Sequence, residues 1–246
     1  MKITILQRDI EWANPVLNVQ KANEAIDRNP GAELYVLPEM FSTGFCTNPE
    51  GIAESADSDT LRWMKCKAAE TGAAIAGSVA VTQEGKYYNR FYFVKPDGSV
   101  DQYDKKHLFT YGGEHKRFTA GEERVVVEWK GFRILLEICY DLRFPVWSRN
   151  IGNQYDVLIY VANWPEARKK VWKILLQARA IENMVYVCGV NRVGEDGKGI
   201  VYRGDSMIIS PRGEKIADIG KRDCVIRTCS LKRAALDKLR AKFPVW

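Results

Sequence analysis

Three residues with reactive side chains each come within two residues of the end of a run of strand-favouring residues. In open α/β sheets, ligands bind outside the carboxyl ends of the strands, so we expect the three side chains to share one cleft. A cysteine thiol becomes a nucleophile when it loses its proton, a glutamate can take that proton, and a lysine can stabilise an oxyanion. The spacing therefore predicts metal-free nucleophilic catalysis by Glu39 after residues 34–37, Lys105 after residues 100–104, and Cys139 after residues 132–138.

Each of these residues also has a purely structural interpretation. A free cysteine is most often a small buried apolar residue, and a lysine most often lies on the surface. Glu39 could be the carboxylate at the start of a helix. For Cys139, the polar residues that follow indicate a helix beginning near Phe144 or Pro145, whose amino terminus would stabilise a thiolate.

Composition restricts the class of protein. The chain has 246 residues, of which 46% are hydrophobic and 28% are charged, as expected for one soluble domain spanning residues 1–246. The first residues form too short an apolar run for a signal peptide, and no run approaches the ~18 residues of a membrane span, so we expect a cytoplasmic protein without membrane contact. The formal charge of +6 arises from lysines and arginines scattered among acids, which favours a solvated surface over a nucleic-acid site.

Cysteine and histidine usage argues against metals and disulfides. The six cysteines include no C-x-x-C pair, and there are two histidines, so we expect no zinc site. In a reducing compartment disulfides are also unexpected. Each cysteine is therefore expected to be either a packed side chain or a reactive thiol.

Strand-like and helix-like runs alternate along the chain, which predicts an α/β fold with mixed sheets, because there are too many hairpins for a purely parallel sheet. Helices are predicted at residues 14–28, 57–71, 166–184 and 231–242. Strands are predicted at residues 3–7, 34–37, 73–82, 87–94, 100–105, 124–129, 133–138, 156–162, 185–191, 206–210, 215–218 and 225–229.

Caps and apolar spacing give these helices expected ends and faces. Asn14 is a possible N-cap of the first helix, and Ser230 of the last. In the second helix, the residues expected to pack are Leu61, Met64, Cys66 and Ala68. In the third, helical periodicity assigns to the core Val171, Ile174, Leu175, Ala178 and Ile181.

Two short motifs have interpretations that the rest of the sequence does not support. Residues 203–206 spell the adhesion tetrapeptide Arg-Gly-Asp-Ser, which would need an exposed extracellular loop. Residues 194–199 are glycine-rich, but no helix and no Lys-Ser/Thr pair follows them, so we interpret them as a turn and not as a phosphate loop.

Several motifs, in the same order along the chain, resemble those of the nitrilase, or carbon–nitrogen hydrolase, superfamily. They are Leu37-Pro-Glu39-Met-Phe-Ser-Thr-Gly-Phe45, Tyr103-Asp-Lys105-Lys-His-Leu-Phe109, Ile138-Cys139-Tyr-Asp-Leu-Arg143-Phe-Pro, Asn163-Trp-Pro165 and Ala178-Arg-Ala-Ile-Glu-Asn183. The family's catalytic lysine stands two residues before a histidine, which selects Lys105 over Lys106. Glu114 resembles the family's second glutamate, although it could instead be an acid on a surface loop.

The resemblance implies a four-layer αββα sandwich that forms a homodimer through one helical layer. It implies a Glu39–Lys105–Cys139 triad that needs no cofactor or metal and whose partners are a small amide substrate and water. Cys139 would attack the amide carbon, Lys105 and a backbone N–H near Tyr140 would hold the oxyanion, and Glu39 would protonate the departing ammonia. Glu39 would then activate the water that hydrolyses the thioester intermediate.

The residues after the cysteine, Tyr140-Asp141, are most similar to the omega-amidase branch, whose substrates are 2-oxoglutaramate and 2-oxosuccinamate. Hydrolysis of N-carbamoyl compounds or nitriles, acyl transfer to an amine, and a non-catalytic binding module remain alternatives. The substrate carboxylate needs a cationic partner, for which Arg143 is a candidate, unless it pairs with an internal acid. The aromatic residues that could form the pocket walls, or else belong to the core, are Phe45, Tyr111 and Trp164.

Overall fold

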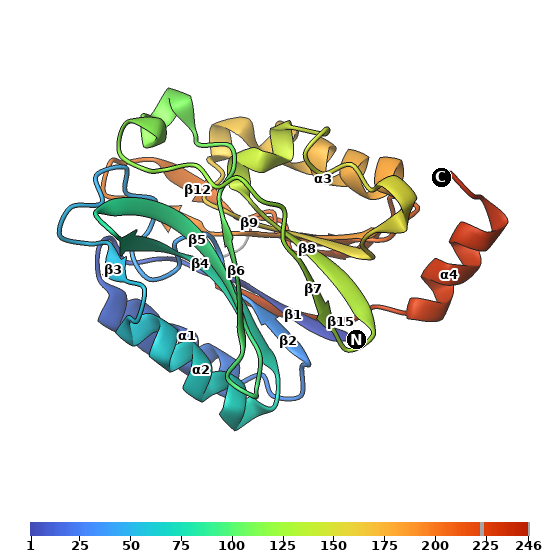
Figure 1. Cartoon of the computed structure of the whole chain (residues 1–246), viewed down its shortest axis with the longest axis horizontal. Helices are drawn as coiled ribbons and strands as arrows, with labels where there is room; N and C mark the ends of the chain where they lie inside the picture. Colours follow the sequence, from blue (N-terminus) through green and yellow to red (C-terminus); the bar gives the residue numbers. More distant parts are fainter. Residues whose placement is uncertain (222–223, 246) are drawn as a thin grey trace.

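The computed structural model describes residues 1–221 and 224–245, which form a four-layer sandwich with two sheets packed face to face and helices outside them (Figure 1). The helices are α1 (Pro15–Asp27), α2 (Asp59–Thr71), α3 (Lys169–Asn183) and α4 (Arg233–Lys242). The strands are β1 (Lys2–Gln7), β2 (Leu34–Val36), β3 (Glu54–Ser55), β4 (Ala74–Gln83), β5 (Lys86–Val94), β6 (Val100–Asp104), β7 (Val126–Trp129), β8 (Phe132–Ile138), β9 (Val157–Ala162), β10 (Tyr186–Asn191), β11 (Val193–Glu195), β12 (Val201–Arg203), β13 (Met207–Ile209), β14 (Lys215–Asp218) and β15 (Val225–Ser230).

Both large sheets are mixed, as the sequence predicted. The first has the order β15-β1-β2-β4-β5-β6, with β3 beside β4, and the second has the order β14-β13-β10-β9-β8-β7. The neighbours β1, β2 and β4 are parallel, as are β8, β9 and β10, whereas hairpins join β4 to β5, β5 to β6 and β7 to β8. Because β6 is two antiparallel steps from β4, strands β2 and β6 run in the same direction and end at the same edge.

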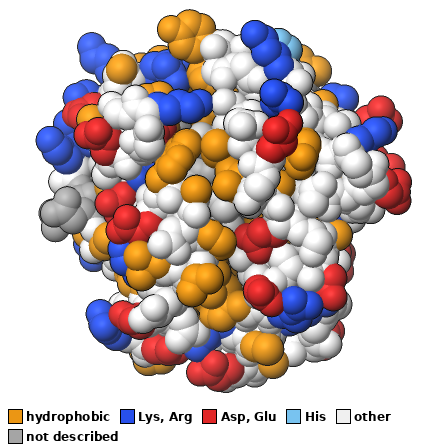
Figure 2. Space-filling view, turned by 90° about the vertical axis from the view of Figure 1, so that its left-hand side faces the viewer, with side chains coloured by type: hydrophobic (Ala, Val, Ile, Leu, Met, Phe, Trp, Pro, Cys, Tyr) orange, Lys and Arg blue, Asp and Glu red, His pale blue; other side chains and the backbone are white. Residues whose placement is uncertain are grey.

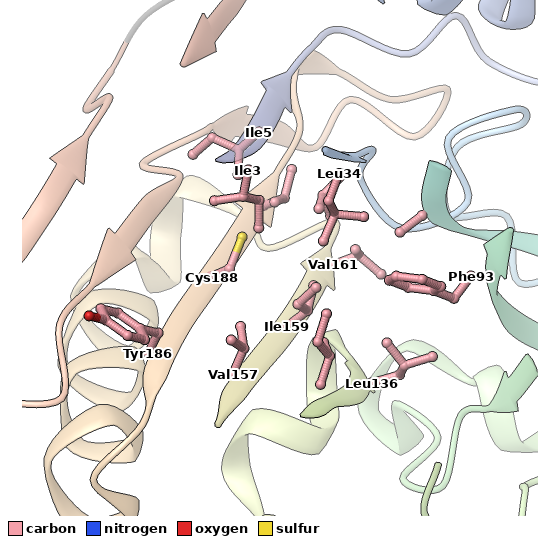
Figure 3. Packing of buried hydrophobic residues seen from close by; sticks show 14 of the residues in the cluster. Ile3, Ile5, Leu34, Phe93, Leu136, Val157, Ile159, Val161, Tyr186 and Cys188 are labelled. Atoms are coloured by element: carbon pink, nitrogen blue, oxygen red, sulfur yellow. The ribbon is translucent and has the colours of Figure 1, made fainter. Parts of the chain in front are cut away.

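The main core lies between the two sheets, where alternate residues of each strand point inward (Figure 3). Ile3 and Ile5 of β1 face Ile159 and Cys188 of the second sheet across this layer. The alternate residues of these strands, which point away from the other sheet, face the helices instead. Leu6 of β1, for example, packs against α1 and α2. Burial on both faces explains why these strands appear in the sequence as continuous apolar runs.

The helical layers have separate cores. Ala22 of α1 and Met64 of α2 pack with Leu6 on the outer face of the first sheet, and Leu176 of α3 packs with Leu158 on the outer face of the second. Burying a side chain as large as that of Met64 or Leu176 contributes about 1.5–3 kcal/mol, so each layer contributes substantially to stability.

The predicted face of the third helix is right only in part, because Val171 and Leu175 pack against the core at the edge of the buried face. Trp172, Leu176 and Ala180 of α3 are buried, whereas the predicted core residues Ile174 and Ile181 are 63% and 52% exposed. This helix carries two apolar stripes, and its periodicity cannot show which of them meets the sheet. The α-helix is also shorter than predicted, because residues 166–168 form a separate 3₁₀ turn before it.

Other helix ends and faces also differ from the prediction. Asn14 does cap α1, since its side chain accepts a hydrogen bond from the N–H of Leu17. Ser230, in contrast, ends β15, and α4 begins after Lys232, because the N–H of Leu231 is bonded to the carbonyl of Met1. In α2, Cys66 is exposed and does not pack.

The adhesion-like tetrapeptide is not an exposed loop. Gly204, Asp205 and Ser206 are buried, and a side chain at Gly204 would collide with Gln7. The glycine-rich run at 194–199 is a turn, as predicted, and it joins the paired strands β11 and β12.

Candidate active site

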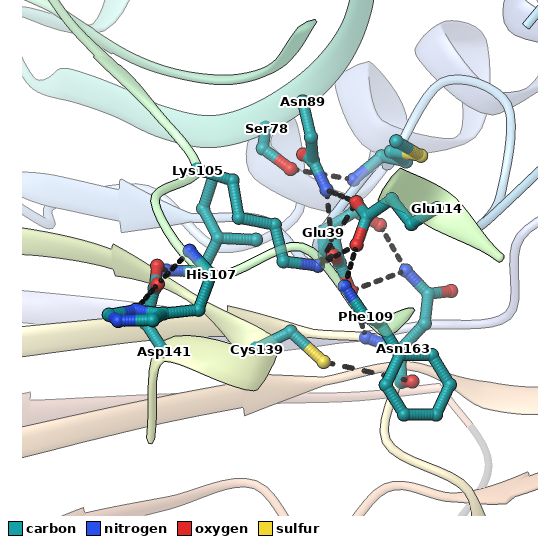
Figure 4. A network of polar contacts seen from close by, with 12 residues as sticks. Glu39, Ser78, Asn89, Lys105, His107, Phe109, Glu114, Cys139, Asp141 and Asn163 are labelled. Carbon is teal, nitrogen blue, oxygen red and sulfur yellow. Dashed lines mark hydrogen bonds and ion pairs between the residues drawn. The ribbon is translucent and has the colours of Figure 1, made fainter. Parts of the chain in front are cut away.

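Glu39 lies in a tight turn after β2 that is held by β4. The N–H of Met40 donates to Oγ of Ser78 at 2.9 Å, and the N–H of Phe41 donates to the carbonyl of Ser78 at 3.1 Å. Met40 has a φ of 44°, in the left-handed region that non-glycine residues rarely adopt. These bonds stabilise the turn that points Glu39 into the space between the sheets, where its side chain is fully buried (Figure 4).

Lys105 follows β6 and lies between two buried glutamates. Its Nζ is 2.9 Å from Oε1 of Glu39 and 2.9 Å from Oε2 of Glu114, and all three side chains are 0% exposed. Burial alone would lower the pKa of Lys105, but the two carboxylates outweigh it and raise that pKa above its ordinary value. Lys105 is therefore a fixed positive charge.

Glu114 is not an acid on the surface of a loop. Its Oε2 accepts the N–H of Phe109 at 2.6 Å, and its Oε1 is 3.2 Å from Nδ2 of Asn89. Burial raises the pKa of Glu114, although Lys105 opposes that shift. The same Asn89 amide donates to Oε1 of Glu39 at 2.8 Å, so one amide joins both carboxylates. The sequence did not predict a role for Asn89; the available signal was the one amide, beside Arg90, in the aromatic-rich strand β5.

Cys139 comes directly after β8 and begins a 3₁₀ turn, Cys139–Arg143. The predicted helix near Phe144 is therefore wrong: the N–H of Phe144 closes this short turn on Asp141 and no α-helix follows. The expectation of a thiolate stabilised by a helix terminus is also wrong, because burial and then the charge of Glu39 raise the pKa of the thiol. Its Sγ lies 4.0 Å from the carbonyl of Asn163. At rest Cys139 carries its proton and needs a base to become reactive.

Asn163, which follows β9, holds Glu39 in place. Its backbone N–H donates to Oε2 of Glu39 at 2.8 Å, and its side-chain amide donates to the backbone carbonyl of Glu39 at 2.7 Å. The sequence identified the motif Asn163-Trp-Pro165 but not this contact. The structure thus brings Glu39, Lys105, Glu114 and Cys139 together from four separate segments (Figure 4).

A pocket opens beside Cys139 and is lined by residues from several loops. Four of the predicted substrate-contacting residues line it, namely Phe45, Tyr140, Arg143 and Trp164. The fifth, Tyr111, does not: its side chain is 88% exposed, and its neighbour Phe109 lines the pocket instead. The end of the sandwich that carries β3 and β12 in Figure 1 faces the viewer in Figure 2, where hydrophobic side chains gather between charged ones.

Further pocket residues were not predicted, among them two cations and a tyrosine. Arg168 lies over the ring of Phe109 at 5.3 Å, Lys198 donates to Oγ1 of Thr47 at 2.9 Å, and Tyr202 donates to Asp196 at 2.8 Å. Lys198 and Tyr202 belong to the β11–β12 hairpin. The glycine-rich turn therefore contributes to the pocket wall.

Over residues 1–221 and 224–245, no group of three or more His, Cys, Asp or Glu side chains has the arrangement of a metal site. Within the same ranges, no helix is long and apolar enough to cross a membrane.

Comparisons with known proteins agree on the family. The carbon-nitrogen hydrolase family matches residues 2–240. The Omega-amidase YafV of Escherichia coli strain K12 is 49% identical over 247 residues, which cover 100% of this chain and 95% of that protein. The 2-oxoglutaramate amidase of Bacillus subtilis is 35% identical, covering 99% of this chain and 95% of that protein.

Solved structures agree as well. A CN-hydrolase superfamily protein from Xanthomonas campestris, XC1258, whose crystal structure has an arsenic adduct in the active site, superimposes with a TM-score of 0.96 at 41% identity, covering 99% of this chain and 95% of that one. Nit3 of Saccharomyces cerevisiae, at 23% identity and a TM-score of 0.90, shares the fold over 100% of this chain and 94% of its own. The chain belongs to the carbon-nitrogen hydrolase family and is a hydrolase acting on carbon–nitrogen bonds.

Proposed function

We propose that the protein hydrolyses the terminal amide of small omega-amido 2-oxo acids, 2-oxoglutaramate and 2-oxosuccinamate, and releases ammonia. One observation carries this choice of substrate: the pocket beside Cys139 is lined by Arg143, Arg168 and Lys198. Among the described residues none of the three has a carboxylate partner, since Arg143 and Arg168 lie over aromatic rings and Lys198 is bonded to a hydroxyl. Unpaired cations around a small pocket favour an anionic substrate. The similarity to an omega-amidase and a 2-oxoglutaramate amidase supports the same choice.

The acylation half of the proposed reaction starts from the protonated thiol. Glu39 takes the proton of Cys139 as Sγ attacks the amide carbon and a C–S bond forms. The carbonyl oxygen becomes an oxyanion, held by the Lys105 ammonium and the backbone N–H of Tyr140. When this intermediate collapses, the C–N bond breaks and Glu39 returns the proton to the leaving nitrogen, which departs as ammonia. A thioester remains on Cys139.

In deacylation, water is the nucleophile and the Cys139 sulfur is the leaving group. Glu39 takes a proton from water as its oxygen attacks the thioester carbon, and Lys105 again stabilises the oxyanion. The C–S bond then breaks, the thiolate takes back the proton from Glu39, and the acid product leaves. Glu114 has no proton to transfer in this scheme. Its ion pair with Lys105 and its bond to Phe109 support a positioning role.

Substrate binding is assigned to the pocket walls and the cations. Phe45, Tyr140 and Trp164 would contact the short carbon chain, and Arg143, Arg168 and Lys198 the carboxylate and 2-oxo group. Lys198 stands on the turn between β11 and β12, so we propose that this hairpin contributes to substrate selection.

The first experiment is a screen of ammonia release by the purified protein. Its substrates are 2-oxoglutaramate, 2-oxosuccinamate, the uncharged pentanamide, N-carbamoyl amino acids and nitriles. We expect the highest kcat/KM for the two 2-oxo acids. A preference for nitriles or carbamoyl compounds would assign a different substrate class, and no turnover of any compound would favour a binding module.

A second experiment tests the cations. We expect Arg168→Met and Lys198→Met each to raise KM for 2-oxoglutaramate roughly tenfold, the size of one lost hydrogen bond between charged groups, and to leave pentanamide turnover unchanged. Lys238→Met, which removes an exposed charge on α4, is the matched control and should change neither. If Arg168→Met and Lys198→Met lower kcat/KM equally for 2-oxoglutaramate and for pentanamide, these residues do not recognise the carboxylate.

We also propose that the protein is a homodimer that works in the cytoplasm. The face of α3 with Ile174 and Ile181 is apolar and exposed, as are Val146 and Ile151 in the segment that is hydrogen-bonded to α3 through Asn150. Covering such a patch with a second copy would remove apolar surface from water. All six cysteines are unpaired thiols, which supports a reducing compartment.

A further inference from the structure

Asp141 is a fully buried carboxylate with no part in the chemistry described above. It is the third residue of the 3₁₀ turn that begins at Cys139, and it touches both reactive segments (Figure 4). Its Oδ2 accepts the N–H of Ile138 at 3.0 Å, and its Oδ1 accepts the N–H of His107 at 2.9 Å. Ile138 precedes the cysteine and His107 is two residues after the lysine. One side chain therefore joins the backbones that carry Cys139 and Lys105.

The remaining partners of Asp141 are side chains. Nδ1 of His107 is 2.8 Å from Oδ1, and Oη of Tyr103 donates to Oδ2 at 2.7 Å. His107 is itself fixed by stacking on Phe144, with ring centroids 3.7 Å apart. Each carboxylate oxygen thus accepts one backbone N–H and one side-chain hydrogen bond.

This set of partners requires a carboxylate. A carboxylate only accepts hydrogen bonds, and the two backbone N–H groups can only donate. In an asparagine, one of the two oxygens is replaced by an NH₂ group, which is a donor. In one orientation of the amide this group would face the N–H of Ile138, and in the other the N–H of His107, so one of the two backbone hydrogen bonds would be lost in either case. Buried Glu137 lies nearby, and burial together with the charge of Asp141 raises the pKa of Glu137 to about 8.

The backbone conformation at the cysteine shows why such a link is needed. Cys139 has a φ of 45°, which is unfavourable for a residue with a side chain, so the turn depends on further contacts that hold it in this conformation. The bond from Ile138 to Asp141 is one such contact, directly before the strained residue. On the other side, Tyr103 also accepts the N–H of Lys106 at 3.1 Å, which strengthens the hold on the lysine segment.

We propose that Asp141 is a positioning residue that sets the placement of the Cys139 turn relative to Lys105, so that an oxyanion formed at the cysteine falls within reach of the lysine. This inference rests on the proposed thioester mechanism but not on the identity of the amide substrate. A shift of the turn would weaken transition-state stabilisation more than substrate binding. Tyr140 and Arg143 lie on this turn, but the other proposed substrate contacts, Phe45, Trp164, Arg168 and Lys198, come from other segments.

The test compares Asp141→Asn with the unsubstituted protein, using whichever amide the latter hydrolyses best. We expect kcat to fall roughly tenfold or more, the size of one hydrogen bond to a charged group, with KM changed less than about twofold. The second measurement is the rate at which iodoacetamide alkylates Cys139, followed by mass spectrometry of the peptide that contains it. This rate needs no substrate, and we expect it to fall as well, because the sulfur would be less well placed near the Lys105 charge.

Two further variants separate positioning from stability. Asp156→Asn changes another buried aspartate, which is paired with Arg133, Arg233 and Arg240 away from the pocket, and it should lower the melting temperature without lowering kcat per folded molecule. Tyr103→Phe removes one donor to Asp141 and keeps the carboxylate; we expect a smaller fall in kcat at unchanged KM.

The outcomes decide the proposal. Unchanged kcat and alkylation in folded Asp141→Asn would overturn it, as would a loss of activity that only follows the loss of folded protein. If Asp141→Asn does not fold, Tyr103→Phe decides: lowered kcat at constant KM supports the proposal, and kcat equal to that of the unsubstituted protein overturns it. If the unsubstituted protein releases no ammonia from any amide, the proposed function fails, while the alkylation rates still test the link between Asp141 and Cys139.

Discussion

Asn163 holds Glu39 at both its side chain and its backbone. The N–H of Asn163 lies 2.8 Å from Oε2 of Glu39, and its amide nitrogen lies 2.7 Å from the backbone carbonyl of the same glutamate. Oε1 of Glu39 is left for Lys105 and Asn89. The proposed base is thus fixed from both sheets, because Glu39 follows β2 of the first sheet and Asn163 follows β9 of the second.

This contact predicts that Asn163→Ala lowers kcat. The substitution keeps the backbone N–H but removes the bond to the carbonyl of Glu39, so the glutamate can leave its place beside the cysteine. We expect a fall of roughly tenfold in kcat, with a smaller change in KM, measured by steady-state ammonia release. Unchanged kcat in Asn163→Ala would show that the turn around Met40 and the remaining bonds to Glu39 position it without the Asn163 side chain.

Cys139→Ala should abolish ammonia release, since no other nucleophile in the site can form the thioester. The protein should stay folded, because Cys139 lies at the edge of the core. Circular dichroism and a melting curve check that Cys139→Ala is folded. Mass spectrometry of both proteins mixed with substrate checks that the acyl adduct forms on the unsubstituted protein and not on the variant. Residual activity above a small fraction of that of the unsubstituted protein would contradict the cysteine mechanism.

Lys105 and Lys106 offer a matched pair. Lys105→Ala should reduce kcat at least ~10²-fold, as expected for loss of an oxyanion donor. It should also destabilise the protein by about 3–5 kcal/mol, because Glu39 and Glu114 are left as buried charges without a cation. Lys106→Ala removes an ammonium that lies over the ring of Trp147 and should leave kcat nearly unchanged. The reverse pattern in kinetics and urea unfolding would mean that the catalytic lysine is Lys106.

Glu137 predicts a pH dependence of stability. Burial and the charge of Asp141 raise the pKa of this carboxyl from its usual 4.5 to about 8. The unfolded chain loses the proton first as pH rises, so the contribution of Glu137 to stability is fully present below about 4.5, declines between the two values and is lost above 8. Glu137→Gln has no such proton, and its free energy of unfolding should fall less between pH 5 and pH 9 when measured in urea. If the free energy of unfolding falls equally between pH 5 and pH 9 in Glu137→Gln and in the unsubstituted protein, the pH dependence belongs to other groups.

The exposed face of α3 predicts the oligomeric state. Ile174→Glu should convert a dimer to monomers, because it places a charge within the apolar patch. Val16→Glu is the control, since Val16 is 80% exposed on α1, at the opposite outer layer of the sandwich. Light scattering after size-exclusion chromatography gives the masses. A dimer that survives Ile174→Glu would locate the interface elsewhere.

Local sequence was sufficient for every strand except the short β3, β11 and β12, and for the reactive residues that follow β2, β6 and β8. Residue types and short spacings define a strand and its end, and Glu39, Lys105 and Cys139 each come within a few residues of such an end. The same local information predicted the turn at residues 194–199, because turn chemistry depends on adjacent residues.

Tertiary structure decided everything that depends on which surfaces meet. It placed Ile174 outside and Trp172 inside, because the choice between two apolar stripes depends on their fit against β9 and β10. It brought Asn89 between Glu39 and Glu114, and Arg168 and Lys198 to the pocket, across separations along the chain that no short motif spans. The sequence by itself determined which side chains could react, and the packing of the two sheets determined their neighbours, because distances between segments are set by that packing.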